Sequence, residues 1–134
     1  MVMILIAGIV VVFVGVGLIG VAVMTAINPL LTERFLNSFA SSARAHYTEQ
    51  AVRLIAGGAI VTFASSMWFA DVFLVFGWII LATTAGLLLV PWHWHHKFGT
   101  WAIPLAIRHI KLYAIGSFVL GSLILYGVSR VMVS

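Results

Sequence analysis

Residues 51–90 read AVRLIAGGAIVTFASSMWFADVFLVFGWIILATTAGLLLV, and this stretch decides how the chain folds. After Arg53, only Asp71 interrupts the apolar run. A straight helix of about 40 residues would extend roughly 60 Å, twice the thickness of the apolar core of a bilayer. The chain must therefore fold back near Asp71, which predicts two helices at about 51–70 and 72–90, with Asp71 capping the second.

Two further apolar segments lie at about 2–26 and 112–129, and the first contains no charged residue. Both are long enough, or nearly so, to cross a bilayer, which takes roughly 20 helical residues. The composition agrees, because 63% hydrophobic and 7% charged residues would leave a soluble domain without polar surface. The sequence therefore predicts an all-α integral membrane protein, a single membrane domain over residues 1–134 with four transmembrane helices.

The two longer connections, at about 30–45 and 92–110, are expected to be amphipathic helices lying in the membrane interface. In the second, Pro104 is expected to begin or kink the helix. Three tryptophans of this connection are typical of the aromatic belt at a membrane surface. They are Trp92, Trp94 and Trp101. The apolar positions of the first connection recur every four residues, at Leu31, Phe35, Phe39 and Ala43.

Basic residues gather in or beside these connections, and of all of them only Arg130 lies elsewhere. The positive-inside rule then places both connections in the cytoplasm and both termini on the opposite side. These basic residues and the tryptophans are the residues that we expect to face lipid headgroups. Each basic residue would gain about 1 kcal/mol from anionic lipid. We expect no nucleic-acid partner, and a bacterial cytoplasmic membrane as the location. The basic residues of the set are Arg34, Arg44, Arg53, Lys97, Arg108 and Lys111.

Arg53 stands one helical turn after Glu49, which is the favourable order for an ion pair on a helix. Thr48 is expected to cap the same helix. A base inside a membrane helix can also mark a substrate path. Because Arg53 lies only about one turn deep, we expect its side chain to extend to the interface instead.

The histidines are the one group of residues in the sequence that could carry chemistry. His93, His95 and His96 follow one another closely, and His46 and His109 are predicted on the same side of the membrane. Imidazole is a common transition-metal ligand, so His93, His95 and His96 are candidate metal ligands and His109 a candidate axial ligand for haem or a pigment. The alternative is that they are polar residues at the depth of the aromatic belt. The cofactor, if any, is unknown.

Small residues within the apolar segments indicate close helix packing, which in lipid replaces the hydrophobic driving force. Packing within the bundle is the first interpretation, and docking against a larger membrane complex is the second. The candidate packing residues are Gly15, Gly17, Gly20, Ala82, Gly86, Ser117 and Gly121.

The order of segments in the sequence also indicates a tandem repeat. Pro29 follows the first membrane segment as Pro91 follows the third, and Arg53 opens the second as Lys111 opens the fourth. Each unit would be a helix, an interfacial helix and a helix, and two such units would be parallel repeats about an axis along the membrane normal. Chance similarity among apolar segments is the alternative.

Motifs for enzymatic chemistry are absent, with no His-Glu-x-x-His, Gly-x-Ser-x-Gly or phosphate-binding glycine loop. In size and hydropathy the chain is similar to the small multidrug resistance transporters, which also have four helices. That family relies on a glutamate in its first helix, and the first segment here has none, so proton-coupled cation export by that mechanism is not expected. The hydropathic layout also looks like that of several small uncharacterised bacterial inner-membrane proteins.

We therefore expect a non-enzymatic accessory or scaffold subunit that packs against a larger membrane protein complex, or against itself. The alternative is a small homo-oligomeric transporter or lipid-binding membrane protein. A further alternative is a metal, haem or pigment carrier that uses the cytoplasmic-side histidines.

Overall fold

The computed structural model describes residues 1–38 and 42–133, which are helical and contain no strand. Three of the helices are long and apolar enough to cross a membrane: α1, α4, and α6 continued by α7. The bounds are α1 Val2–Ile27, α2 Pro29–Ser38, α3 Ala43–Phe63, the 3-10 turn η1 Ala64–Ser66, α4 Ala70–Leu89, α5 Trp92–Arg108, α6 Ile110–Val128 and α7 Arg130–Val133.

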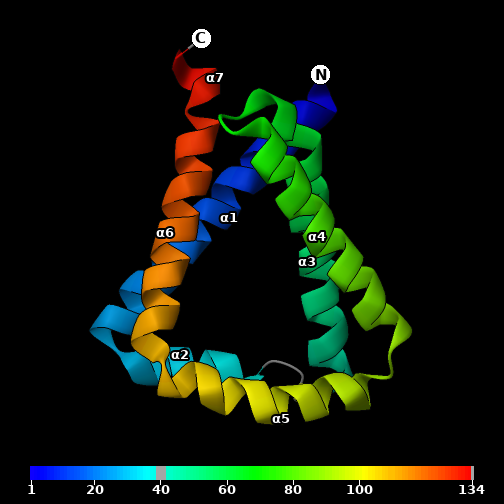
Figure 1. The fold of residues 1–134 in the computed structure, drawn as a ribbon, viewed down its shortest axis with the longest axis vertical. Helices are drawn as coiled ribbons and strands as arrows, with labels where there is room; N and C mark the ends of the chain where they lie inside the picture. The colour runs from blue at the N-terminus through cyan, green and yellow to red at the C-terminus, as the bar shows by residue number, and fades with distance from the viewer. Residues whose placement is uncertain (39–41, 134) are drawn as a thin grey trace.

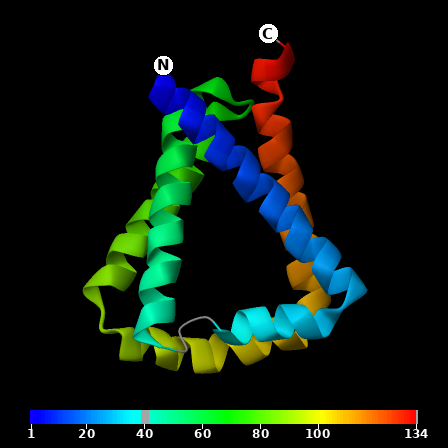
Figure 2. The same cartoon turned by 180° about the vertical axis from the view of Figure 1, so that it is seen from behind.

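The helices build an open triangular frame (Figure 1). One side is the pair α1 and α6, the other is the pair α3 and α4, and the two sides meet at an apex where α1 also contacts α3. The helices α2 and α5 lie across the base and contact each other, as the view from behind also shows (Figure 2). Both chain termini and the turn between α3 and α4 lie at the apex.

The α3 helix differs from its predicted bounds of 51–70. It begins at Ala43, because the hydroxyl oxygen of Ser42 accepts the backbone N–H of Ala45 at 3.1 Å and so caps the helix. The prediction that Thr48 caps this helix is wrong, since Thr48 lies inside it and donates to the Arg44 carbonyl at 2.8 Å. The polar residues of this added N-terminal part explain why α3 is not among the three helices apolar enough to span.

The turn between α3 and α4 confirms that the chain folds back near Asp71. Phe69 has a left-handed backbone, with φ 59° and ψ 43°, and occupies the N-cap position of α4. Asp71 therefore lies in the first turn and is not the cap, although a carboxylate there still favours the positive end of the helix dipole. The backbone N–H of Trp68 donates to the Gly127 carbonyl at 2.9 Å, which ties the turn to α6.

Close glycine contacts hold the pair α1 and α6. A methyl group built on Gly121 would lie 2.7 Å from the carbonyl oxygen of Gly15, so the two backbones touch. One on Gly15 would lie 2.9 Å from Leu125. One turn before Gly121, the Ser117 hydroxyl donates to the Leu18 carbonyl at 2.6 Å. These contacts place Gly15, Ser117 and Gly121 at a helix interface, as expected from the sequence.

The pair α3 and α4 is built in the same way. A methyl group on Gly77 would lie 2.7 Å from the Val61 side chain, and one on Gly57 would lie 3.0 Å from Ile80 and Leu81. The sequence analysis did not select Gly57 or Gly77 as packing residues. Both helix pairs therefore bring backbones together at a glycine on each helix.

The buried core is small and lies near the apex, where the two sides meet. Its fully buried members include Val11, Ile60, Met67 and Ile124, which come from α1, α3, the turn and α6. Gly8 faces the Phe63 ring at this junction. The frame is thus closed at one end by apolar packing and at the other by the base helices.

Four of the predicted packing positions lie on outward-facing parts of the described helices. A methyl group on Gly17, Gly20 or Gly86 would meet nothing within 4 Å among the described residues. The fourth, Ala82, is exposed. Their interpretation as packing residues inside the bundle is therefore wrong, because these positions face away from the helix pairs.

The base helices differ in detail from the sequence prediction. In α2 the buried residues are Thr32 and Leu36, while the predicted apolar positions Leu31 and Phe35 are exposed. Phe39 lies outside the described residues, and Ala43 belongs to α3. In α5, Pro104 lies inside the helix and does not begin it.

Candidate functional site

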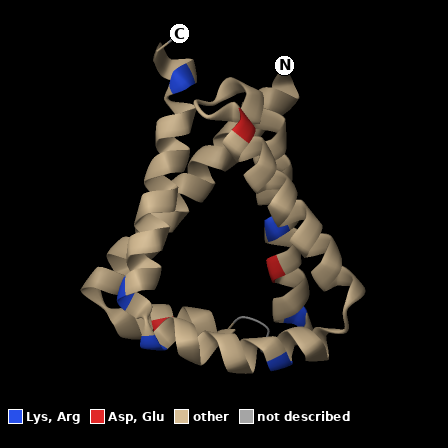
Figure 3. Ribbon diagram, viewed as in Figure 1, with Lys and Arg blue, Asp and Glu red and all other residues tan. Residues whose placement is uncertain are grey.

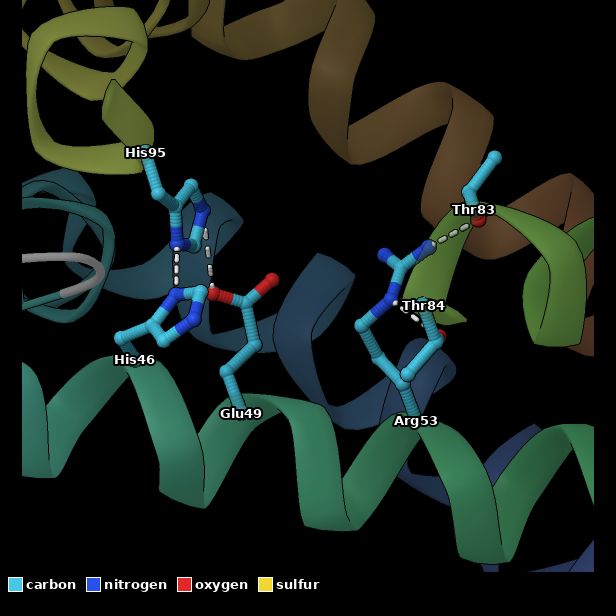
Figure 4. A network of polar contacts seen from close by, with 6 residues as sticks. All are labelled: His46, Glu49, Arg53, Thr83, Thr84 and His95. Atoms are coloured by element: carbon cyan, nitrogen blue, oxygen red, sulfur yellow. Dashed lines mark hydrogen bonds and ion pairs between the residues drawn. The ribbon is translucent and has the colours of Figure 1, made fainter. Parts of the chain in front are cut away.

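One face of the first half of α3 is polar. Glu49 and Gln50 lie three and four residues after His46, and Arg53 lies four and three residues after them, so the four side chains lie on one side of the helix. His46 is fully buried and Gln50 is 1% exposed. His46 and Glu49 meet His95 of α5, and Arg53 meets residues of α4, at the corner of the frame where the three helices converge (Figure 4).

The two imidazoles at this corner are in direct contact. Nδ1 of His46 lies 2.6 Å from Nδ1 of His95, and the ring centroids are 4.8 Å apart at an interplanar angle of 66°. Two bare lone pairs would repel at this distance, and two N–H groups would clash. One nitrogen must therefore donate and the other accept, so the two rings carry their Nδ1 protons differently.

His95 also faces the carboxylate of Glu49. Its Nε2 lies 3.5 Å from Oε2 of Glu49, and the two side chains are 10% and 21% exposed. The predicted pairing of Glu49 with Arg53 is not formed, since among the described residues the Glu49 carboxylate faces His95 instead. Burial is the largest influence on the pKa of His95 and lowers it below its ordinary value of 6.5, against the opposing effect of the Glu49 carboxylate.

Arg53 reaches across to α4. Its Nε donates to the Thr84 hydroxyl at 2.9 Å and one terminal nitrogen donates to the Thr83 hydroxyl at 2.5 Å. Both hydroxyls donate in turn to carbonyls of their own helix, at Ile80 and Ile79. Neutral hydroxyls are thus the hydrogen-bond partners of this permanently charged side chain within the described chain, and Arg53 contacts α4 in place of the predicted extension to the interface.

Four buried polar atoms of this corner have no hydrogen-bond partner among the described residues. They are Nε2 of His46, Oε2 of Glu49, and both amide atoms of Gln50. Leaving a buried polar atom without a partner costs about 1–3 kcal/mol. Such atoms concentrated on two turns of one helix distinguish this corner from the rest of the frame.

The predicted metal ligands do not converge. The rings of His93 and His96 lie 4.4 and 6.0 Å from that of Trp92, whereas His95 turns toward α3. The described residues contain no group of three or more His, Cys, Asp or Glu that could hold a metal ion. His109 is exposed at the junction of α5 and α6, between the two helices and not on an apolar helix face.

Basic residues mark the base of the frame, as Figure 3 shows in blue. The predicted interfacial bases on or next to α2, α5 and the helix ends are exposed, and Trp94 and Trp101 are each 65% exposed. Trp92 is half-buried. The exposed bases are Arg34, Arg44, Lys97, Arg108 and Lys111.

Apolar grooves lie on the other helix pair and at the apex. The larger has a volume of about 610 Å³ and runs between the N-terminal half of α1 and the end of the chain near Met132. The smaller, of about 300 Å³, lies between α1 and α6 and is lined by Ala22, Ala114 and Phe118 among others. Neither groove has polar side chains comparable to those of the α3 corner.

Sequence reasoning named His95, Glu49 and Arg53 but missed their arrangement. It did not select Gln50 or Thr84, and it left His46 apart from the other histidines. The sequence feature that could have revealed this site is the spacing of the polar residues on α3, which places them on one face of the helix. Comparison of the chain with protein-family models, curated proteins and solved structures finds no match.

Proposed function

We propose that the chain is a non-enzymatic integral membrane protein that packs against other membrane proteins as an accessory or scaffold subunit. The observation that carries this proposal is the outward position of Gly17, Gly20 and Gly86, where a methyl group would meet none of the described residues within 4 Å. Gly15 and Gly121, by contrast, form a helix contact within the chain. In lipid, small residues let a neighbouring helix approach closely, so unused ones favour a partner helix.

The exposure of the frame supports the same proposal. Only 22% of the most apolar stretch of α1 and 17% of that of α4 are buried. Lipid can cover these faces, but van der Waals packing between helices requires partners that fit. Long helix faces with open glycine positions offer such a fit to helices of another subunit.

We further propose that the chain crosses the membrane four times. Support comes from α3, which runs from the base to the apex beside α4 (Figure 1) and has 21 residues. At 1.5 Å per residue this is about 31 Å, close to the apolar thickness of a bilayer. The helices α2 and α5 would then lie in the interface, where their exposed bases contact anionic lipid headgroups.

The proposed orientation follows from the same charges. The base of the frame faces the cytoplasm and both termini face the opposite side of a bacterial cytoplasmic membrane. Because the chain contains no cysteine, single cysteines can test this directly. Ser65→Cys near the apex should react with a membrane-impermeant maleimide on intact cells, and Thr100→Cys on α5 should react only after the membrane is opened. The reverse pattern would invert the orientation.

Extraction in mild detergent tests the accessory role. The natural chain should co-purify in fixed proportion with a larger membrane protein, and a Gly20→Leu and Gly86→Leu double variant should lose that partner. The same variant should keep the thermal unfolding temperature of the isolated chain, because neither position contacts the described residues. A small particle made of this chain alone would contradict the proposal.

A second candidate is a small homo-oligomeric transporter or lipid-binding membrane protein. Arg53 favours it, because its hydrogen-bond partners within the described chain are the neutral hydroxyls of Thr83 and Thr84. A guanidinium without a carboxylate partner at this depth attracts an anionic headgroup or solute. The mass of the detergent particle separates the two candidates, since this one predicts a homo-oligomer.

A further inference from the structure

The polar corner of α3 is not needed to join two helices. The pair α1 and α6 uses the same kind of glycine contact as α3 and α4, and beyond it, toward the base, lies an apolar groove with Ala22 and Ala114. The face of α3 at this corner has instead four buried polar atoms without a hydrogen-bond partner among the described residues, of which Oε2 of Glu49 faces His95 at 3.5 Å. A feature that costs stability and that the matching junction lacks calls for another role.

The contact between His46 and His95 fixes where protons lie. Because Nε2 of His95 faces the Glu49 carboxylate, that nitrogen carries a proton when Glu49 is ionised. Neutral His95 then has a bare Nδ1, which accepts from Nδ1–H of His46 across 2.6 Å. Neutral His46 is left with a bare Nε2, which is the buried atom without a partner among the described residues.

We propose that His46, His95 and Glu49 form a proton relay at the corner of α3 and α5. In this relay a water molecule that reaches Nε2 of His46 supplies the proton, the Nδ1 proton of His46 passes to Nδ1 of His95, and the Nε2 proton of His95 passes to Glu49. One proton enters and the carboxylate becomes a carboxylic acid. Each imidazole ends neutral with its proton on the opposite nitrogen, and no electron is transferred.

The geometry sets two conditions on this relay. The 3.5 Å separation of His95 and Glu49 must shorten by roughly half an ångström to become a hydrogen bond. The rings must also return to their first tautomers, either by reverse transfer or by rotation. The 21% exposed side chain of Glu49 gives the relay its outlet, while fully buried His46 is its inner end.

The relay goes beyond the proposed subunit role and stands on the geometry of this corner alone. Histidine and carboxylate chains at membrane depth are the usual parts of proton paths. Arg53 is the other charged side chain of this face of α3, and it is held away from the relay by Thr83 and Thr84 on α4. Burial first, and the positive charge of Arg53 as a smaller influence, lower the pKa of His95.

Nuclear magnetic resonance of the natural chain, labelled with nitrogen-15 in histidine, tests the resting state. A coupling across the hydrogen bond should join the two Nδ1 nuclei, one with a proton and one without. The coupling should vanish in His46→Gln and His95→Gln and persist in His93→Gln, whose ring lies on Trp92. Identical tautomers in both rings, or a bound metal ion in stoichiometric amount, would overturn the proposal.

Infrared spectroscopy after a rapid drop in pH tests the transfer. The carboxylic acid band of Glu49, identified by its loss in Glu49→Gln, should appear more slowly in His46→Gln and His95→Gln than in the natural chain. Its rate should be unchanged in His93→Gln. Equal rates in all four proteins would mean that Glu49 takes its proton directly from water, and the relay would be wrong.

Discussion

The same kind of glycine contact holds both sides of the frame, but the two sides differ in polarity toward the base. On one side Gly121 meets Gly15, and on the other Gly57 lies against the residues that follow Gly77 by one turn. Toward the base the sides diverge, because α1 and α6 enclose an apolar groove while α3 presents a polar face to α4 and α5. The glycine contacts therefore hold each pair together, and the polar corner is an addition to one of them.

The largest expected effect concerns the glycine contact of α1 and α6. In Gly121→Leu the new Cβ would lie 2.7 Å from the Gly15 carbonyl oxygen, and a backbone atom cannot move aside as a side chain can. The helices must separate, which should cost about 3 kcal/mol or more. Thermal unfolding of the purified chain, followed by circular dichroism in detergent, measures the loss.

Gly116→Leu is the matched control, because Gly116 lies on the same helix and a methyl group there meets nothing within 4 Å among the described residues. It should unfold at the temperature of the natural chain. On the other side, Gly77→Leu should destabilise somewhat less than Gly121→Leu, since its nearest neighbour is the Val61 side chain. Equal stability of Gly121→Leu and Gly116→Leu would remove the glycine contact as the common basis of both pairs.

Acidification should weaken only the polar side. Burial lowers the pKa of His95 below 6.5, Glu49 opposes this, and His46 with Arg53 adds to it. As the pH falls, the unfolded chain therefore binds a proton before the folded chain does. The stability contributed by neutral His95 is present above about pH 6.5 and is lost as the pH falls through that value toward the lower folded pKa.

Unfolding temperatures measured from pH 7.5 to 5 check this dependence. His95→Gln should remove that part of the pH dependence, and His93→Gln should retain it, because His93 lies against Trp92 and away from the corner. A dependence of equal size in both variants would assign it to other groups.

The sequence predicted the apolar elements well and the polar ones poorly. The reversal near Asp71 followed from length alone, because about 40 apolar residues exceed the thickness of a bilayer. The start of α3 was placed eight or so residues late, since Arg44, His46 and Glu49 resemble an interfacial segment more than a helix that continues into the frame. The composition shows where the sequence changes from polar to apolar, and in α3 this change lies inside the helix and not at its start.

The candidate site could be predicted only in its parts. Glu49 and Arg53 have the spacing of an ion pair, yet each finds a partner on another helix, at His95 and Thr84. Contacts between helices distant in the sequence depend on how the frame closes, and no local pattern carries that information. Which glycines face a partner and which face outward depends on the same closure.

Arg53→Met sharpens the comparison by making the polar side more like the apolar one. The hydroxyls of Thr83 and Thr84 stay bonded to their own helix, so the change leaves no new buried group without a partner. We expect a loss of about 1 kcal/mol in the free energy of unfolding. Denaturation in a detergent series measures it, and a loss as large as that of Gly121→Leu would show that the polar corner is a main support of α3 and α4.

The smallest effect is expected on the apolar side, at the hydrogen bond between Ser117 of α6 and the Leu18 carbonyl of α1. Ser117→Ala removes the 2.6 Å contact with the Leu18 carbonyl, which can keep its bond within α1. Hydrogen bonds between membrane helices contribute about 0.6 kcal/mol on average. Ser122→Ala is the control on the same helix, and the difference between the two unfolding temperatures measures the bond. A larger cost than that of Arg53→Met would reverse the comparison, because the apolar side would then depend more on the hydrogen bond of Ser117 than the polar side does on Arg53.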